Sequence, residues 1–263
     1  MKIAIIGSGN IGGSIARGLA QGTMIQASDI ICTAVSEATL EKMKAFNPSF
    51  ILTHDNVEAA RQADIILLAV KPWKIEEVID EIKPALDFKR QIIASVAAGV
   101  TFAQLTAYLT KGTDTKPTIF RIMPNTAIAV RSSMTFLSAH NATQEQTELM
   151  IRIFNELGNA MLIEEQLMGA GTAVASCGIA FALRYIRAAM EGGVELGFYP
   201  KQAQEIVAYT VKGAADLLIA SQNNPEVEID KVTTPGGVTI KGLNAMEAGG
   251  FTTAVINGLK ASK

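Results

Sequence analysis

The chain has 263 residues, of which 49% are hydrophobic and 18% are charged, a composition typical of a globular protein with a sizeable apolar core. Its formal net charge of −2 at pH 7, without a cluster of Lys or Arg residues, argues against nucleic acid and anionic membranes as partners. These properties favour a small-molecule ligand.

Local composition predicts the location of the protein and the state of its cysteines. Met1 leads directly into an apolar strand and not into a signal peptide. The longest apolar stretch, at about 172–183, ends at Arg184, short of the roughly 20 residues that a membrane span needs. Cys32 and Cys177 lie in apolar surroundings. We therefore expect a cytoplasmic protein with two buried free thiols, no membrane-spanning segment and no metal site.

The first twenty residues carry the motif around which the chain is organised. Residues 3–6 form an uninterrupted apolar run, which is typical of a strand in a parallel sheet that is covered on both faces. Gly7, Gly9 and Gly12 follow with G-x-G-x-x-G spacing, and a helical apolar repeat begins within the glycine run. Strand, glycine turn and helix in this order predict a dinucleotide-binding domain of the Rossmann type, with a doubly wound, mostly parallel sheet.

Each glycine of this motif has a physical role. Gly7 permits the tight turn, Gly9 lets the backbone approach a pyrophosphate, and Gly12 lets the helix pack close to the strand. The N–H groups at the start of the helix, reinforced by the helix dipole, form an anion site. We therefore predict that a dinucleotide binds along Gly7, Ser8, Gly9, Asn10, Ile11 and Gly12.

The end of the second strand predicts the type of dinucleotide. Residues 29–35 form an apolar strand, and Ser36 can cap a helix over 37–46. An acidic residue at this strand end would bind the 2′-hydroxyl of NAD, whereas a small residue such as Ala34 leaves room for the 2′-phosphate of NADP. Glu37 follows without an arginine nearby. The pattern favours NADPH, with NADH as the alternative.

The next strands are predicted over 50–53 and 64–70, with a helix over 57–62 between them. The later strand stops at a Lys-Pro pair, at the edge of the sheet where ligands bind in open α/β folds. The candidate ligand residues there are Ala69, Val70, Lys71 and Pro72. A plain strand end with a solvated lysine is the equally weighted alternative.

Residues 91–96 and 118–123 are the following predicted strands. The first leads into a small-residue loop at Ala97, which could lie under a nicotinamide ring, and Thr101 then begins a capping box. The second leads into Asn125, which is either an ordinary turn residue or a ligand contact. His54 and His140 are expected to be surface histidines and not catalytic acids.

The alternation of strand and helix ends at about residue 163. Strands over 133–138 and 160–163 flank a helix that begins at Thr143 with a second capping box. We expect a nucleotide-binding domain of residues 1–163 and an all-helical domain of residues 164–263.

The helical domain contains long predicted helices over 173–196 and 201–221 and two shorter ones near the end. The helix over 173–196 is too apolar to be covered by its few sequence neighbours. It therefore predicts dimerisation, with packing against the nucleotide-binding domain as the alternative.

A second candidate site lies near the C-terminus. Thr234 is expected to cap a helix whose first turn carries Pro235, Gly236 and Gly237. Glycines there leave the N–H groups of Gly237, Val238 and Thr239 open to an anion such as a small carboxylate, and the Thr239 hydroxyl can donate or accept a hydrogen bond. A tight junction between loop and helix is the equally weighted alternative.

These motifs together resemble the Δ1-pyrroline-5-carboxylate reductase family, the last enzyme of proline biosynthesis, over essentially the whole chain. The segments that carry the resemblance are 7–12, 69–72, 95–99, 121–125, 234–239 and 249–251, and the most specific of them is 234–239. The resemblance implies a Rossmann domain followed by a helical domain that interleaves with a partner's helical domain in a homodimer, often within a ring of dimers.

The resemblance also implies the reaction and the site. The implied activity is an NAD(P)H-dependent hydride transfer to the C=N carbon of 1-pyrroline-5-carboxylate, which gives L-proline. The cofactor would contact the glycine loop, Asn56, residues 69–72 and Ala97. The substrate carboxylate would lie on residues 237–239, with the Thr239 hydroxyl reaching the ring nitrogen.

The chain departs from the family pattern near the family's substrate pocket. Where the family usually has Gly-Ser-Gly-Pro-Ala-Tyr, this chain has Ser176-Cys-Gly-Ile-Ala-Phe181, while Arg187 replaces a usual glutamate and Gly169 a usual aspartate. The alternatives are a reductase of another cyclic imine or imino acid and a non-catalytic NADP-binding paralogue. A β-hydroxyacid dehydrogenase is disfavoured, because no helical lysine pairs with a second glycine motif.

Overall fold

The computed structural model describes residues 1–111 and 115–263, which form two compact units, 1–176 and 177–263. The first unit contains an eight-stranded sheet with the order β3-β2-β1-β4-β5-β6-β7-β8. Strands β1 to β6 are parallel, β7 is antiparallel to β6, and β8 is parallel to β7. The strands are β1 (Ile3–Ile6), β2 (Ile30–Thr33), β3 (Ile51–Thr53), β4 (Ile65–Leu68), β5 (Ile92–Ser95), β6 (Thr118–Met123), β7 (Ser133–His140) and β8 (Gly158–Leu162). The expected doubly wound, mostly parallel sheet is confirmed.

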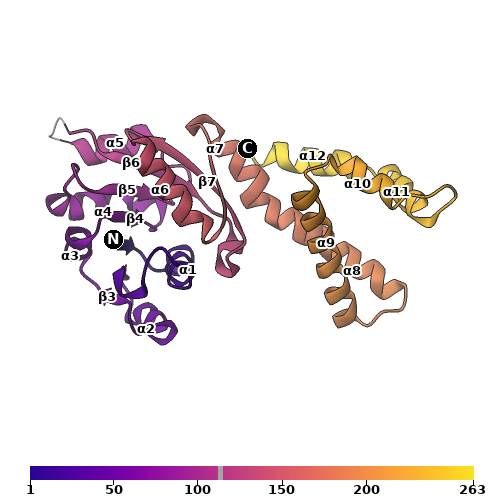
Figure 1. The fold of residues 1–263 in the computed structure, drawn as a ribbon, viewed down its shortest axis with the longest axis horizontal. Helices are drawn as coiled ribbons and strands as arrows, with labels where there is room; N and C mark the ends of the chain where they lie inside the picture. The colour runs from indigo at the N-terminus through magenta and orange to yellow at the C-terminus, as the bar shows by residue number, and fades with distance from the viewer. Residues whose placement is uncertain (112–114) are drawn as a thin grey trace. The chain divides into compact units, whose positions relative to one another are not determined.

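Helices cover both faces of this sheet (Figure 1). One face is covered by α1 (Asn10–Leu19), α2 (Glu37–Phe46) and α6 (Gln144–Asn155), and the other by α3 (Asn56–Gln62), α4 (Ile75–Ile82) and α5 (Phe102–Thr110). The capping boxes predicted at Thr101 and Thr143 are both formed, at the starts of α5 and α6. Short 3₁₀ segments lie at Ala27–Asp29, Pro72–Lys74, Lys83–Ala85, Thr126–Val130 and Glu165–Leu167.

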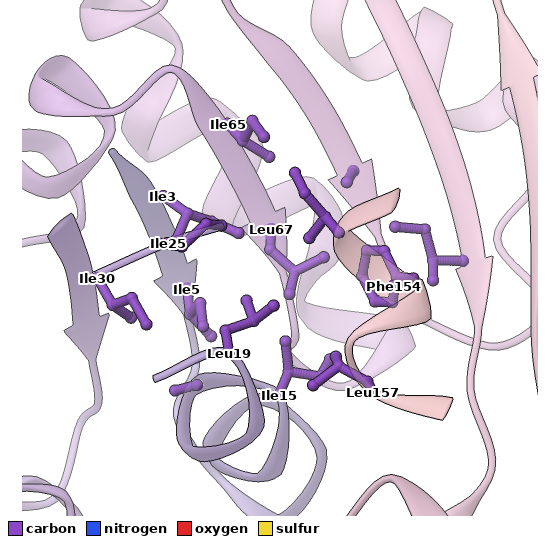
Figure 2. Packing of buried hydrophobic residues seen from close by; sticks show 14 of the residues in the cluster. Ile3, Ile5, Ile15, Leu19, Ile25, Ile30, Ile65, Leu67, Phe154 and Leu157 are labelled. Carbon is purple, nitrogen blue, oxygen red and sulfur yellow. The ribbon is translucent and has the colours of Figure 1, made fainter. Parts of the chain in front are cut away.

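The continuous apolar runs are explained by burial on both faces. In β1, Ile3 and Ile5 contribute to one apolar cluster, while the intervening residue and Ile6 contribute to the cluster on the opposite face. Figure 2 shows the first cluster, in which strand side chains meet Ile15 of α1 and Phe154 of α6. Each face of the sheet therefore has its own closed core.

The second unit consists of helices that bury little among themselves. It contains α8 (Gly178–Glu195), α9 (Pro200–Ser221), α10 (Pro225–Lys231), α11 (Val238–Ala248) and α12 (Phe251–Ala261). Helix α8 packs against α9, where Gly193 lies close to Ala203. Of residues 177–263, all of which the structure describes, only Ala203 is a buried hydrophobic residue. Large apolar side chains such as Leu183 and Leu217 are more than half exposed.

The long apolar helix differs from the expected one at its start. The four residues of α7 (Met168–Gly171) lead into a π-helical segment, Thr172–Cys177, before α8 begins. The whole helical run Glu165–Glu195 has 31 residues and a mean hydropathy of 1.5, which is long and apolar enough to cross a membrane by length and composition. The expectation that the apolar stretch at about 172–183 is too short to span a membrane was therefore wrong about its length, because the helical run that contains it is longer.

Two other expectations need correction. The helix predicted to include Pro235 begins only at Val238, because Gly236 adopts a left-handed backbone conformation with φ of +70° and the Gly237 N–H donates to the Thr234 carbonyl (2.9 Å). Residues 234–237 thus form a turn. Cys32 is buried as expected, but Cys177 is only partly buried.

Candidate functional site

The predicted cofactor residues of the first unit lie at one edge of the sheet. Each follows the carboxyl end of a strand from β1 to β6, and these six strands are parallel. The structure therefore brings Gly7, Ser8, Gly9, Asn10, Ile11, Gly12, Ala34, Asn56, Ala69, Val70, Lys71, Pro72, Ala97 and Asn125 to the same edge. In open α/β sheets this edge is the ligand-binding side.

The glycine loop has the shape that a pyrophosphate requires. Gly7 has φ of +96°, and a Cβ on Gly12 would overlap the Gly7 carbonyl oxygen, so neither position accepts a larger residue. A Cβ on Gly9 would meet no atom within 4 Å, which leaves the loop open on its outer side. Helix α1 begins directly after Gly9 without a side-chain cap, so the N–H groups of its first turn are available to an anion. These residues fit a dinucleotide.

A chain of hydrogen bonds holds the glycine loop from behind. The buried Thr33 accepts from the Gly7 N–H through Oγ1 (3.2 Å), and its hydroxyl donates to Asn56 Oδ1 (2.6 Å). Asn56 in turn donates from Nδ2 to the Glu81 carboxylate (3.0 Å). The Thr33 carbonyl also accepts from the Ser8 N–H (2.7 Å).

Sequence reasoning identified Asn56 but missed Thr33 and Glu81 in this hydrogen-bond chain. The available signal was a threonine at the end of an otherwise apolar strand. Because these hydrogen bonds are connected to one another, they fix both the glycine loop and the Asn56 amide.

Beside the end of β2, the His54 ring is paired with the Glu37 carboxylate. His54 Nδ1 lies 2.6 Å from the Ala34 carbonyl oxygen, and Nε2 lies 2.9 Å from the Glu37 carboxylate. Hydrogen bonding to Glu37, followed by that to the Ala34 carbonyl, raises the pKa of His54. Val35, which lies between Ala34 and Glu37 in the sequence, is fully exposed.

Of the remaining candidates at this edge, Asn125 has an internal role. Its Oδ1 accepts from the Ala127 N–H (3.0 Å), and its Nδ2 donates to the Ala175 carbonyl (3.3 Å) within the π-helical segment. The Ser176 hydroxyl donates to the Pro124 carbonyl (3.4 Å) beside it. Asn125 is buried and anchors the π-helical segment to the end of β6, and its predicted contact with the cofactor stays a prediction.

The loops after β4 and β5 differ in exposure. Lys71 and Trp73 are exposed, and Trp73 is the single tryptophan of the chain. Ala97 is buried, and its N–H donates to the Ser95 hydroxyl (3.3 Å). The fluorescent side chain of Trp73 therefore lies directly after the predicted cofactor residues Lys71 and Pro72.

The predicted substrate residues belong to the second unit. A Cβ on Gly237 would lie 2.6 Å from Thr234 Oγ1, so the turn requires glycine there. Because the Gly237 N–H is already bonded within the turn, only those of Val238 and Thr239 are left for an anion at the uncapped start of α11. Thr239 is exposed. The predicted anion site therefore loses one of its three N–H donors, that of Gly237, and keeps the other two and the Thr239 hydroxyl.

Other chemistries find little support in the described residues. Burial raises the pKa of the Cys32 thiol to about 11, which makes it a poor nucleophile at neutral pH. Within residues 1–111 and 115–263, no group of three His, Cys, Asp or Glu side chains is placed to hold a metal ion.

Two family models match different parts of the chain. Residues 2–99 match a sequence model described as NADP oxidoreductase, coenzyme F420-dependent, and residues 165–263 match one described as pyrroline-5-carboxylate reductase dimerisation. The second match covers the helices whose apolar side chains are exposed, so it supports self-association through them.

Individual proteins match the chain over its whole length. Pyrroline-5-carboxylate reductase 2 from Dictyostelium discoideum is 38% identical over 99% of this chain and 90% of its own length. Pyrroline-5-carboxylate reductase 1 from the same organism is also 38% identical, and the chain spans 48% of that protein's length. The crystal structure of Plasmodium falciparum pyrroline carboxylate reductase with NADP bound superimposes with a TM-score of 0.85 at 27% identity, covering 100% of this chain and 95% of that one.

Proposed function

The chain belongs to the pyrroline-5-carboxylate reductase family and is an oxidoreductase acting on the C=N bond of pyrroline-5-carboxylate, and from this premise we propose how its residues divide the reaction. The first unit binds NADPH at the glycine loop. The second unit binds the carboxylate of the substrate at the start of α11 and presents the Thr239 hydroxyl to the ring nitrogen. The product is L-proline.

The reaction needs few reactive side chains. The reduced nicotinamide supplies the hydride, and a protonated imine carbon is already electrophilic, so the protein chiefly has to hold the two together. This agrees with a site built from backbone N–H groups, glycines and hydroxyls. The observation that carries the proposal is the glycine loop, which is open at Gly9 and closed to side chains at Gly7 and Gly12.

NADPH is proposed over NADH on three observations. The end of β2 carries the small residue Ala34 and no acidic residue, and the Glu37 carboxylate at the start of α2 is paired with His54. The relative from Plasmodium falciparum was crystallised with NADP. The matching model of residues 2–99 is that of an NADP oxidoreductase.

The proposed assembly is a homodimer formed through the second unit, with a ring of dimers as the larger alternative. It is supported by the exposed apolar side chains of α8 and α9 and by the dimerisation model that matches this region. A second copy would cover the same helical run that is apolar enough for a membrane span. The cytoplasmic location stays a prediction.

The test is the rate at which purified protein oxidises NADPH with pyrroline-5-carboxylate, measured for Thr239→Val and Thr239→Ser. Loss of a positioned hydroxyl should lower kcat/KM by about a hundredfold in Thr239→Val, whereas Thr239→Ser should stay within about threefold of the parent. Thr210→Val is the matched control, because the Thr210 hydroxyl bonds only the Ile206 carbonyl within α9 (2.8 Å).

Equal activity of Thr239→Val and Thr210→Val would contradict the assigned role of Thr239. Nucleotide binding without oxidation by the parent protein would favour another cyclic imine as substrate or a non-catalytic paralogue.

A further inference from the structure

The Glu37 and His54 side chains form a pair at the end of β2 that the general dinucleotide-binding pattern does not include. Glu37 is the first residue of α2, and His54 follows β3, so the pair joins the segments that follow two neighbouring strands, β2 and β3. It lies along a groove of about 490 Å³ that is lined by residues of α2, of β3 and of the segments next to them. The pair is thus placed where the ribose of a bound dinucleotide is discriminated.

The hydrogen bonds determine the charge of this pair. Both ring nitrogens of His54 face acceptors, the Ala34 carbonyl at Nδ1 and the Glu37 carboxylate at Nε2. A neutral imidazole can donate from only one nitrogen, whereas the imidazolium donates from both. The two contacts are therefore satisfied together only when His54 is protonated, in which state it neutralises Glu37.

The other charged groups near His54 are few. Along the groove, α2 contributes Glu41 and Lys44 besides Glu37. Asp55, the next residue in the chain, accepts from the Glu58 N–H at the start of α3 (2.9 Å). Glu41 and Lys44 carry opposite charges, so the protonation of His54 controls whether Glu37 adds an uncompensated negative charge at the end of β2.

We propose that the Glu37 and His54 pair sets the preference between NADPH and NADH, admitting the 2′-phosphate while His54 is protonated and repelling it once Glu37 stands alone. The inference rests on the proposed use of NADPH. A 2′-hydroxyl carries no charge, so NADH binding should respond little to the same change. Because the pair is exposed to water, the repulsion between the Glu37 carboxylate and the 2′-phosphate is weak. It should change the ratio of the affinities for NADPH and NADH by about three- to tenfold.

The experiment measures dissociation constants of NADPH and NADH from the quenching of Trp73 fluorescence between pH 6 and pH 8.5. In the parent protein, the preference for NADPH should fall about three- to tenfold as the pH rises and His54 loses its proton. His54→Gln should show the low preference already at pH 6. Glu37→Gln should keep a high preference across the range.

Two variants serve as controls in this experiment. A phosphate monoester itself ionises near pH 6, but it does so equally in the parent and in Glu37→Gln, so only the difference between them reports on the pair. Glu41→Gln removes the same charge one turn further along the groove and should keep the parental pH dependence.

The same slope in the parent and in Glu37→Gln, or an equally flat slope in Glu41→Gln, would overturn the inference. If neither NADPH nor NADH bound at any pH, the proposed function itself would be overturned.

Discussion

Residues 1–176 close around two buried apolar clusters, whereas residues 177–263 form helices that leave most of their large apolar side chains exposed. In the first unit the sheet supplies a surface that helices cover on both sides (Figure 1). In the second, α8 and α9 pack on each other and still expose residues such as Leu183 and Leu217. The first unit carries its own core, whereas the second leaves an apolar surface that we propose a second copy of the chain covers.

The largest expected effect is on stability, and it distinguishes packing within one chain from packing between two chains. Phe154 is fully buried in the first unit, so Phe154→Ala should lower the free energy of unfolding by about 3–5 kcal/mol. This loss should be the same at every protein concentration, because the lost contacts lie within one chain. Leu217→Ala should instead destabilise the protein by an amount that changes with concentration, because Leu217 is 58% exposed within its own chain.

Urea unfolding of both variants at two protein concentrations checks this difference. A concentration-independent effect of Leu217→Ala would mean that α9 is completed within a single chain.

A smaller effect is expected from the hydrogen-bond chain behind the glycine loop. Thr33→Val keeps the shape of the side chain but removes the hydroxyl that bonds the Gly7 N–H and Asn56 Oδ1, so the affinity for NADPH should fall about tenfold. Thr33→Ser keeps the hydroxyl and should restore affinity to within about twofold. The measurement is the dissociation constant from Trp73 fluorescence, together with the KM for pyrroline-5-carboxylate.

The KM for pyrroline-5-carboxylate should stay unchanged in both variants, because Thr33 belongs to the first unit alone. An equal loss of affinity in Thr33→Ser and Thr33→Val would assign the effect to packing and not to the hydroxyl.

The first unit was predictable from sequence because its signals are local. Continuous apolar runs located β1, β2, β4 and β5 to within about two residues, because these strands are buried on both faces of the sheet. The threonines at 101 and 143 marked two helix starts, because a capping box involves only four adjacent residues. The candidate cofactor residues were brought together because they follow the carboxyl ends of parallel strands.

The features that sequence reasoning missed depend on contacts between distant residues. The π-helical segment is anchored by Asn125, about fifty residues earlier in the chain. The pairing of Glu37 with His54 joins the segments that follow β2 and β3. The start of α11 was placed too early because Pro235 suits a first helical turn, whereas the left-handed conformation of Gly236 delays the helix. Local composition cannot show which partner a side chain meets.

Sedimentation equilibrium of the purified full chain, from submicromolar to tens of micromolar concentration, tests most directly whether the second unit is completed by another copy. We expect a mass of at least two chains throughout this range, and a shift toward the monomer in Leu217→Glu, which would place a charge on the apolar face of α9. A monomeric parent protein that nevertheless reduces pyrroline-5-carboxylate with NADPH would contradict it.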